Sequence, residues 1–323
     1  MDAYLGTIED FRFITTDFLT NAALSFASSL FVKEPDFDAV IGIARSGLIP
    51  ASVIACHFNL PLFSFNTRDK KLQYLSGGLR APENPKIKKP LVVEDSYAHG
   101  YSASLIQSLR FEFPNAFIVT IFSSTFQPEG IDAFAYFYPL PHFFEWCFMN
   151  TGYSANLVVD FDGILCHEYE KINYSEEEFN EYIKNAPPLY LPRRFPVIIL
   201  TARHSGNIGN SLLWLDKNNV KFLELHFWNG DPDARWKTPS TIAEWKAQKL
   251  KSIAARRHVN FYVESSPNIA QNVAYLTGIP TICPLAKMVF GWSSDKLKDI
   301  IWYKKENEKT CQESHAKQVK LLN

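Results

Sequence analysis

Short apolar runs alternate along the chain with segments in which apolar residues recur at helical spacing. This alternation is typical of parallel β-sheets whose strands are joined by helices. In the first half, the apolar runs predict strands at residues 39–43, 62–65, 90–94 and 116–122. The helical spacing between them predicts helices at residues 48–57 and 102–111. We therefore expect the first half to fold as an α/β domain with a parallel sheet.

The alternation stops and then starts again near residue 152. Aromatic residues crowd positions 134–148, and Asn150-Thr151-Gly152 interrupts the pattern before a new apolar run. Beyond it, strands are predicted at residues 157–160, 197–200, 222–226, 259–263 and 281–282, and helices at residues 209–218, 240–255 and 269–277. We expect two doubly wound parallel-sheet α/β domains, residues 1–152 and 153–302, followed by a charged tail at residues 303–323.

The composition narrows the class of protein. The 323 residues are 46% hydrophobic and 15% aromatic, which is enough for two buried cores. Thirty-three Lys and Arg residues oppose 34 Asp and Glu residues, and no long basic stripe is present, so we expect no nucleic-acid partner. Five scattered cysteines, none in a CxxC pair, favour reduced thiols.

The N-terminus has neither the basic start nor the apolar segment of a signal peptide. No apolar run approaches the roughly 18 residues that a membrane-spanning helix needs. We therefore expect a cytoplasmic protein without stable membrane insertion, and we leave open whether it forms a homo-oligomer.

Glu94 and Asp95 end the third predicted strand, and a turn of mostly small residues leads from them into a helix. Carboxylates at the carboxyl end of a strand lie where open α/β sheets bind ligands, and they can accept hydrogen bonds from a pair of sugar hydroxyls. The turn at residues 98–102 offers backbone N–H groups at a helix N-terminus, which is a favourable place for a phosphate. Together these features predict a pocket for a phosphorylated sugar.

This segment resembles the motif with which type I phosphoribosyltransferases bind phosphoribosyl pyrophosphate (PRPP). The resemblance extends over residues 36–125 and implies that Glu94 and Asp95 bind the ribose 2- and 3-hydroxyls. It assigns the 5-phosphate to the loop formed by Ala98, His99, Gly100, Tyr101 and Ser102. His99 stands where this family usually has threonine.

A second loop carries the same resemblance. The sequence Gly-Ile-Ala-Arg-Ser-Gly at residues 42–47 resembles the family's pyrophosphate loop, which implies contacts from Ala44, Arg45, Ser46 and Gly47. Residues 66–88 are predicted to form a long mobile loop where the family has its flexible catalytic loop. Its basic residues could close over the pyrophosphate, although single lysines in such loops are more often solvated. These residues are Arg68, Lys70, Lys71 and Arg80.

Asp160 and Asp162 stand at the start of the second domain in the sequence Leu-Val-Val-Asp-Phe-Asp-Gly. Two carboxylates at the end of a buried strand are costly unless a cation or a phosphate is involved. Their spacing lets Asp160 attack a bound phosphorus as the nucleophile. It lets Asp162 protonate the leaving alkoxide and later activate water.

This segment resembles the first motif of the haloacid dehalogenase (HAD) superfamily, and the other motifs follow in the family's order. The resemblance implies that the Thr201 hydroxyl binds the phosphate and that Lys246 neutralises the phosphoryl group, with Lys249 as the alternative. Arg203 and His204 follow Thr201 and could touch the substrate, but we interpret them as surface residues at the start of a helix.

The HAD resemblance also implies a cofactor. Mg²⁺ would be held by Asp160, by the Asp162 carbonyl and by Glu264. Ser265 replaces the second acidic residue of the last motif, so we expect fewer protein carboxylates and more water around the ion.

The segment between Asp162 and Thr201 is too short for a large α/β cap. Residues 175–185 could form at most a small helical lid. An open phosphatase site of this kind suits a bulky substrate.

Together the two resemblances imply a bifunctional enzyme, similar to the PRPP-dependent ribofuranosyltransferase/phosphatase of bacterial polysaccharide synthesis. The first domain would transfer ribose 5-phosphate from PRPP to an acceptor such as a bacterial glycan, and the second would remove the 5-phosphate to leave a β-ribofuranosyl group. One alternative is nucleotide salvage, in which a base is the acceptor and the second domain is a nucleotidase. Another is a PRPP-sensing regulator, against which the neutral charge and the lack of a helix-turn-helix pattern weigh.

Overall fold

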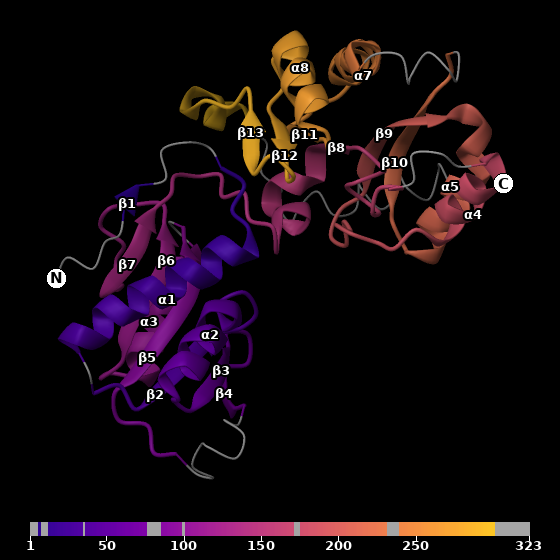
Figure 1. Ribbon diagram of the computed structural model, residues 1–323. Helices are drawn as coiled ribbons and strands as arrows, with labels where there is room; N and C mark the ends of the chain where they lie inside the picture. Colours follow the sequence, from indigo (N-terminus) through magenta and orange to yellow (C-terminus); the bar gives the residue numbers. More distant parts are fainter. Residues whose placement is uncertain are drawn as a thin grey trace. The chain divides into compact units, whose positions relative to one another are not determined.

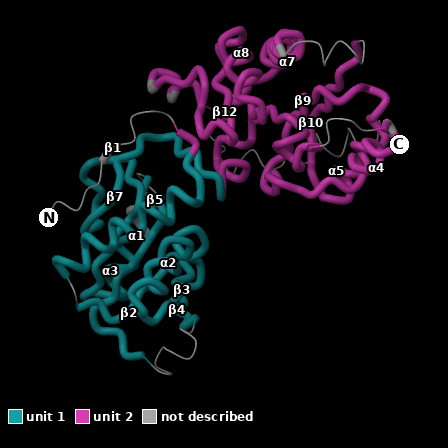
Figure 2. Tube along the Cα trace, viewed as in Figure 1, with its two compact units in different colours: residues 1–10, 14–146 teal, residues 11–13, 147–323 magenta. Residues whose placement is uncertain are grey.

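The computed structural model describes residues 6–7, 12–34, 36–75, 85–98, 101–170, 175–230 and 239–300 (Figure 1). The chain forms two compact units (Figure 2). Unit 1 comprises residues 1–10 and 14–146, and unit 2 comprises residues 11–13 and 147–323. Each unit contains its own mixed β-sheet with mostly parallel strands, which is the α/β architecture that the alternating pattern predicts.

Unit 1 contains a seven-stranded sheet in the order β1-β7-β6-β5-β2-β3-β4. Its strands are β1 (Gly6–Thr7), β2 (Ala39–Ile43), β3 (Leu62–Asn66), β4 (Lys71–Tyr74), β5 (Pro90–Tyr97), β6 (Phe117–Ser123) and β7 (Ala133–Phe137). Its helices are α1 (Thr16–Lys33), α2 (Leu48–Phe58) and α3 (Tyr101–Glu112). Neighbouring strands are parallel except for β3 and β4. Every residue of β2 is buried, which explains why its sequence is apolar throughout rather than alternating.

Helix α1 and strands β1, β4 and β7 of unit 1 are absent from the predicted elements. Helix α1 begins after Thr15, whose side chain accepts a hydrogen bond from the Phe18 N–H. It buries Leu19, Phe26 and Leu30 at helical spacing, so the apolar stripe is present in the sequence.

The prediction of a long loop at residues 66–88 is wrong at its start. Strand β4 pairs antiparallel with β3, and Arg68 and Lys70 lie in the turn between them. Leu72 and Tyr74 alternate along β4 and pack against the core of unit 1, which is why the segment is held as a strand. Residues 76–84, including Arg80, lie outside the described residues.

Strand β5 continues past its predicted end at Glu94 as far as Tyr97, because Tyr97 still pairs with Ser123 of β6. Glu94 and Asp95 therefore lie within the strand, near its carboxyl end.

Unit 2 contains a six-stranded sheet in the order β10-β9-β8-β11-β12-β13. Its strands are β8 (Leu157–Val159), β9 (Val197–His204), β10 (Phe222–Trp228), β11 (Phe261–Val263), β12 (Thr281–Cys283) and β13 (Met288–Phe290). Its helices are α4 (Glu176–Asn185), α5 (Ile208–Lys217), α7 (Pro239–Ala254) and α8 (Pro267–Thr277). Neighbouring strands are parallel except for β12 and β13. No helix in the described ranges is long and apolar enough to cross a membrane.

The neighbours β9, β8 and β11 run parallel through the middle of this sheet (Figure 1). Val159 of β8 pairs with Ile199 of β9 on one side and with Val263 of β11 on the other. The residues that directly follow these positions therefore gather at one edge of the sheet, where parallel α/β folds bind ligands.

Candidate functional site

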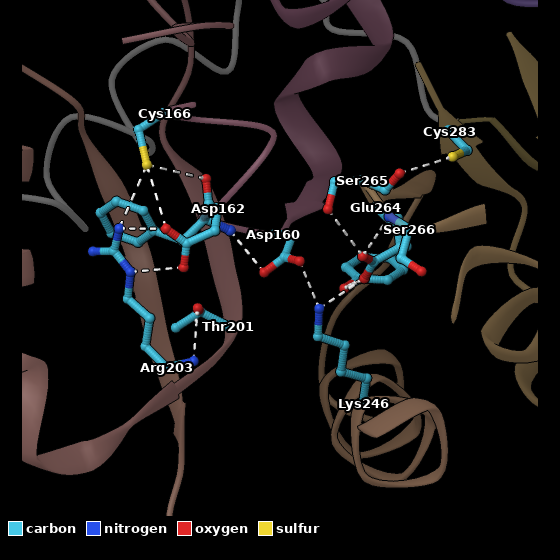
Figure 3. Close-up of polar contacts among 12 residues, drawn as sticks. Asp160, Asp162, Cys166, Thr201, Arg203, Lys246, Glu264, Ser265, Ser266 and Cys283 are labelled. Atoms are coloured by element: carbon cyan, nitrogen blue, oxygen red, sulfur yellow. Dashed lines mark hydrogen bonds and ion pairs between the residues drawn. The ribbon is translucent and has the colours of Figure 1, made fainter. Parts of the chain in front are cut away.

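The polar site of unit 2 lies at the carboxyl ends of β8, β9 and β11 (Figure 3). Asp160 follows β8, Thr201 lies in β9, and Glu264 follows β11. Lys246 reaches the same place from α7. All four side chains are buried, although charged residues are seldom buried without partners. The structure thus brings together four of the residues that the sequence predicted for a phosphatase site.

Lys246 connects the two acidic residues of this site. Its Nζ donates to Asp160 Oδ2 at 2.6 Å and to Glu264 Oε2 at 2.7 Å. Burial acts to lower the pKa of Lys246, but the two carboxylates outweigh it and raise this pKa above its usual value. Lys246 therefore remains a cation in a buried site. Of the two candidate lysines, Lys246 makes these contacts rather than Lys249.

Each acidic residue has further donors that fix its orientation. The Tyr262 hydroxyl donates to Glu264 Oε2 at 2.6 Å, and the Ser266 N–H donates to Glu264 Oε1 at 3.1 Å. The Phe161 N–H donates to Asp160 Oδ1 at 2.8 Å, which leaves Asp160 Oδ2 facing Lys246.

The interpretation of Arg203 as a surface residue is wrong. Strand β9 runs on to His204, and Arg203 is only 2% exposed. The backbone N–H of Arg203 donates to Thr201 Oγ1 at 3.1 Å, which links the two residues of β9 directly. Its Nε and Nη2 donate to the two carboxylate oxygens of Asp162 at 2.9 and 2.6 Å. In the sequence, Thr201 and Arg203 are two positions apart, and this spacing fits a continuing strand as well as the start of a helix.

The neighbouring residues differ in their roles. His204 Nδ1 accepts a hydrogen bond from the Gly206 N–H at 3.1 Å, so this side chain caps the turn before α5. Gly163 has a φ of +72°, and a Cβ there would lie 2.5 Å from Ser265 Cβ. The loop after Asp162 therefore requires glycine at this position.

The donor atoms at this edge suit a hard cation. The carboxylates of Asp160 and Glu264 converge on one ammonium group, and the expected third donor, the Asp162 carbonyl, is also an oxygen. No group of three or more His, Cys, Asp or Glu side chains that could hold a metal occurs in the described part of the chain. Because Mg²⁺ is often held by one or two carboxylates and keeps several waters, the residues present fit this ion as a two-carboxylate site.

In unit 1, both carboxylate oxygens of Asp95 have partners. Ser46 Oγ donates to Asp95 Oδ1 at 2.9 Å, and Trp146 Nε1 donates to Asp95 Oδ2 at 2.8 Å. Phe144 stacks on the Trp146 ring with a centroid separation of 4.5 Å. The acidic pair is thus linked to Ser46 of the expected pyrophosphate loop. Trp146 was not predicted as a site residue, and its only sign in the sequence is the aromatic cluster at residues 134–148.

Glu94 lies in a less favourable environment than Asp95. Its Oε2 is buried and has no hydrogen-bond partner within the described residues. Burial raises the pKa of Glu94 well above its usual value, and the charge of Asp95 raises it further. A buried carboxylate oxygen without a donor is costly, so a ligand with hydroxyl groups would find an acceptor here.

The expected phosphate loops are described in part. Ala44, Arg45, Ser46 and Gly47 connect β2 to α2, and the peptide between Ala44 and Arg45 is cis. A Cβ on Gly47 would lie 2.8 Å from the carbonyl oxygen of Val93, so glycine lets this loop approach β5 closely.

The second phosphate loop is less complete. Ala98 follows β5, and Tyr101 and Ser102 begin α3. His99 and Gly100 lie outside the described residues.

No protein-family model matches the chain, and no curated protein matches it. Among solved structures, it is similar to the xanthine-guanine-hypoxanthine phosphoribosyltransferase of Helicobacter pylori, with 16% identity and a TM-score of 0.32 over 44% of this chain and 91% of that chain. It is similar to a purine phosphoribosyltransferase of Pyrococcus horikoshii, with 16% identity and a TM-score of 0.27 over 44% and 91% of the two chains. It is also similar to the orotate phosphoribosyltransferase of Francisella tularensis, with 12% identity and a TM-score of 0.25 over 62% and 80%. TM-scores this low do not establish a shared fold, so the function proposed below rests on the residues themselves.

Proposed function

We propose that unit 2 is a Mg²⁺-dependent phosphatase of the HAD type. The observation that carries this proposal is the buried cluster in which Lys246 contacts both Asp160 and Glu264 beside Thr201, at the ends of parallel strands. A buried ion pair contributes little net stability, because removing both charges from water offsets their attraction. Such clusters are more common where charge is needed for chemistry.

The proposed chemistry has two steps. Asp160 forms a bond to phosphorus, the bond from phosphorus to the leaving oxygen breaks, and the leaving oxygen takes a proton through Asp162. Water then attacks the phosphorus of the aspartyl-phosphate and passes a proton to Asp162, the bond from phosphorus to Asp160 breaks, and phosphate departs with Asp160 restored as a carboxylate. Lys246 and Thr201 would neutralise and orient the phosphoryl oxygens. Mg²⁺, held by Asp160, Glu264 and the Asp162 carbonyl, would supply additional positive charge for the phosphoryl group.

We further propose that unit 1 transfers ribose 5-phosphate from PRPP to an acceptor with release of pyrophosphate. The support is the link from Ser46 to Asp95, which joins the expected pyrophosphate loop to the expected ribose-binding pair. A second support is Glu94 Oε2, which has no hydrogen-bond partner among the residues that the structure describes. The 5-phosphate would bind at residues 98–102, and pyrophosphate at residues 44–47.

The presence of both units in one chain supports a coupled function. Unit 1 would add a phosphorylated ribosyl group to an acceptor, and unit 2 would remove the phosphate to leave a β-ribofuranoside. The 10-residue α4 is the one helix described between Asp162 and Thr201, and a lid this small favours a bulky acceptor such as a bacterial glycan. Salvage of a base to a nucleoside uses the same chemistry with a smaller acceptor.

The test uses the substitution Asp160→Asn and mass spectrometry of the product made from PRPP, Mg²⁺ and either a glycan or a base. The wild-type protein should yield an acceptor that carries unphosphorylated ribose, and the variant should add a group heavier by one phosphate. A variant that still removes the phosphate would exclude Asp160 as the nucleophile.

Two outcomes separate the alternatives. Pyrophosphate release with a base but with no glycan would support salvage. PRPP binding without turnover on any acceptor would support a regulator.

The double substitution Glu94→Ala/Asp95→Ala should remove PRPP turnover and leave phosphatase activity intact. Normal PRPP binding by that variant in calorimetry would exclude the pair as the ribose anchor.

A further inference from the structure

The guanidinium of Arg203 is held in one orientation by hydrogen bonds to three residues, Asp162, Ser211 and Cys166. Its Nε donates to Asp162 Oδ2 at 2.9 Å, and its Nη2 donates to Asp162 Oδ1 at 2.6 Å. Its Nη1 donates to Ser211 Oγ of α5 at 2.9 Å. This forked geometry fixes the plane of the carboxylate as well as its position, which a single ammonium group could not do.

The surroundings of Arg203 reinforce this orientation (Figure 3). The guanidinium carbon lies 3.7 Å from the centroid of the Phe161 ring, and the ring belongs to the residue between Asp160 and Asp162. The Arg203 N–H donates to Thr201 Oγ1 at 3.1 Å. Arg203 therefore contacts Thr201 in β9 and Phe161 in the segment after β8.

Arg203 and Asp162 differ in exposure. The side chain of Arg203 is 1% exposed, whereas that of Asp162 is 26% exposed. The Cys166 thiol, also buried, donates to Asp162 Oδ1 at 3.5 Å. Arginine and thiol thus hold the carboxylate on its buried side and leave its other side accessible to a substrate. Arg203 itself has no such access, so it can act only through Asp162.

We propose that Arg203 is a positioning residue that holds the Asp162 carboxylate at the leaving-group oxygen, and that the site is thereby adapted to alkyl phosphate monoesters such as sugar phosphates. This inference rests on the proposed phosphatase function of unit 2. An alkoxide is a poor leaving group and needs a well-placed proton donor, whereas an aryl oxide with a low pKa departs without one. Misplacing a catalytic group by about 1 Å can cost about 10²-fold in rate, and that loss should appear mainly with the alkyl substrate.

The test compares two substrates in the full chain with Mg²⁺: ribose 5-phosphate, which has an alkyl leaving group, and 4-nitrophenyl phosphate, which has an aryl one. Arg203→Lys keeps the positive charge but loses the fork. Its kcat on ribose 5-phosphate should fall about 10²-fold, with a much smaller fall on 4-nitrophenyl phosphate and an unchanged KM for both. Ser211→Ala removes only the Nη1 contact and should shift the ratio of the two rates in the same direction by a smaller factor.

Two comparisons show whether the effect passes through Asp162. In an Asp162→Asn background, Arg203→Lys should cause little further loss, because the carboxylate that it positions is already gone. Arg193→Lys is a matched control: Arg193 is exposed and donates to the Asn218 carbonyl, and its substitution should leave both rates unchanged.

The results that overturn the inference are distinct from those that overturn the phosphatase. Equal losses on the two substrates, or a raised KM with an unchanged kcat, would show that Arg203 does not act by positioning Asp162. A wild-type protein that hydrolyses neither substrate would instead refute the proposed function of unit 2, and this inference with it.

Discussion

Replacement of Lys246 by methionine should destabilise unit 2 by about 3–5 kcal/mol, the usual cost of removing one partner from a buried ion pair. Methionine has a similar length, so the change removes charge rather than volume. Lys246, Asp160 and Glu264 have side chains that are 1%, 9% and 1% exposed, so water cannot replace the lost ammonium group. The two carboxylates would then face each other without a cation.

Differential scanning calorimetry at neutral pH measures this loss, with a chelator present so that no metal ion substitutes for the ammonium group. A loss of 1 kcal/mol lowers the melting temperature by roughly 2–4 °C in a unit of this size, so the expected decrease is roughly 6–20 °C. Adding Glu264→Gln should restore part of the stability, because the amide removes one of the two charges and can still accept from the Tyr262 hydroxyl.

Lowering the pH should also reduce the difference in the free energy of unfolding between the Lys246→Met variant and the wild type. Without Lys246, the native carboxylates would have pKa values above those of the unfolded chain, so the native state gains stability as protons bind at lower pH. A loss below about 1 kcal/mol, or a double variant no more stable than the single one, would refute this account of the cluster.

Three further predictions follow from the described contacts. Burial and the charge of Asp95 raise the pKa of Glu94 in the native state, so Glu94→Gln should stabilise unit 1 by about 1 kcal/mol at neutral pH. The gain should vanish below about pH 4, where the Glu94 carboxyl group is protonated in both the native and the unfolded state. Urea denaturation at the two pH values tests this prediction. Trp146→Phe removes the N–H donor to Asp95 and should weaken PRPP binding about 10-fold in calorimetry, while an unchanged affinity would exclude a role for this contact. Gly163→Ala should lower the stability of unit 2 by about 1–3 kcal/mol, because the new methyl group would meet Ser265 at a positive φ, and a neutral result in thermal melting would contradict the packing described here.

The sequence by itself was sufficient for the architecture and for the positions of most strands. Parallel strands buried on both faces must be apolar throughout, as β2 is, so they stand out between polar turns and helices. The HAD resemblance assigned Asp160 and Glu264 to one site before their distance was known, and both residues directly follow strands, where such sheets bind ligands. Lys246 could be chosen because the HAD resemblance expects a lysine between those motifs.

Only the tertiary structure decided the partners of these residues. Whether an arginine is solvated or buried depends on a carboxylate that meets it, and Asp162 lies 41 positions away from Arg203. Trp146 lies 51 positions away from Asp95, and nothing in the aromatic cluster around Trp146 indicates that its indole N–H meets that carboxylate.

The ends of β5 and β9 were also decided by tertiary structure. Each strand continues past its apolar run because a neighbouring strand is still present to pair with its backbone. Local pattern therefore specifies which segments form strands, since it reflects burial of the segment's own side chains. The pairing of strands, the close approach of backbone segments and the partners of buried charges depend on residues far apart in the sequence, which only folding brings together.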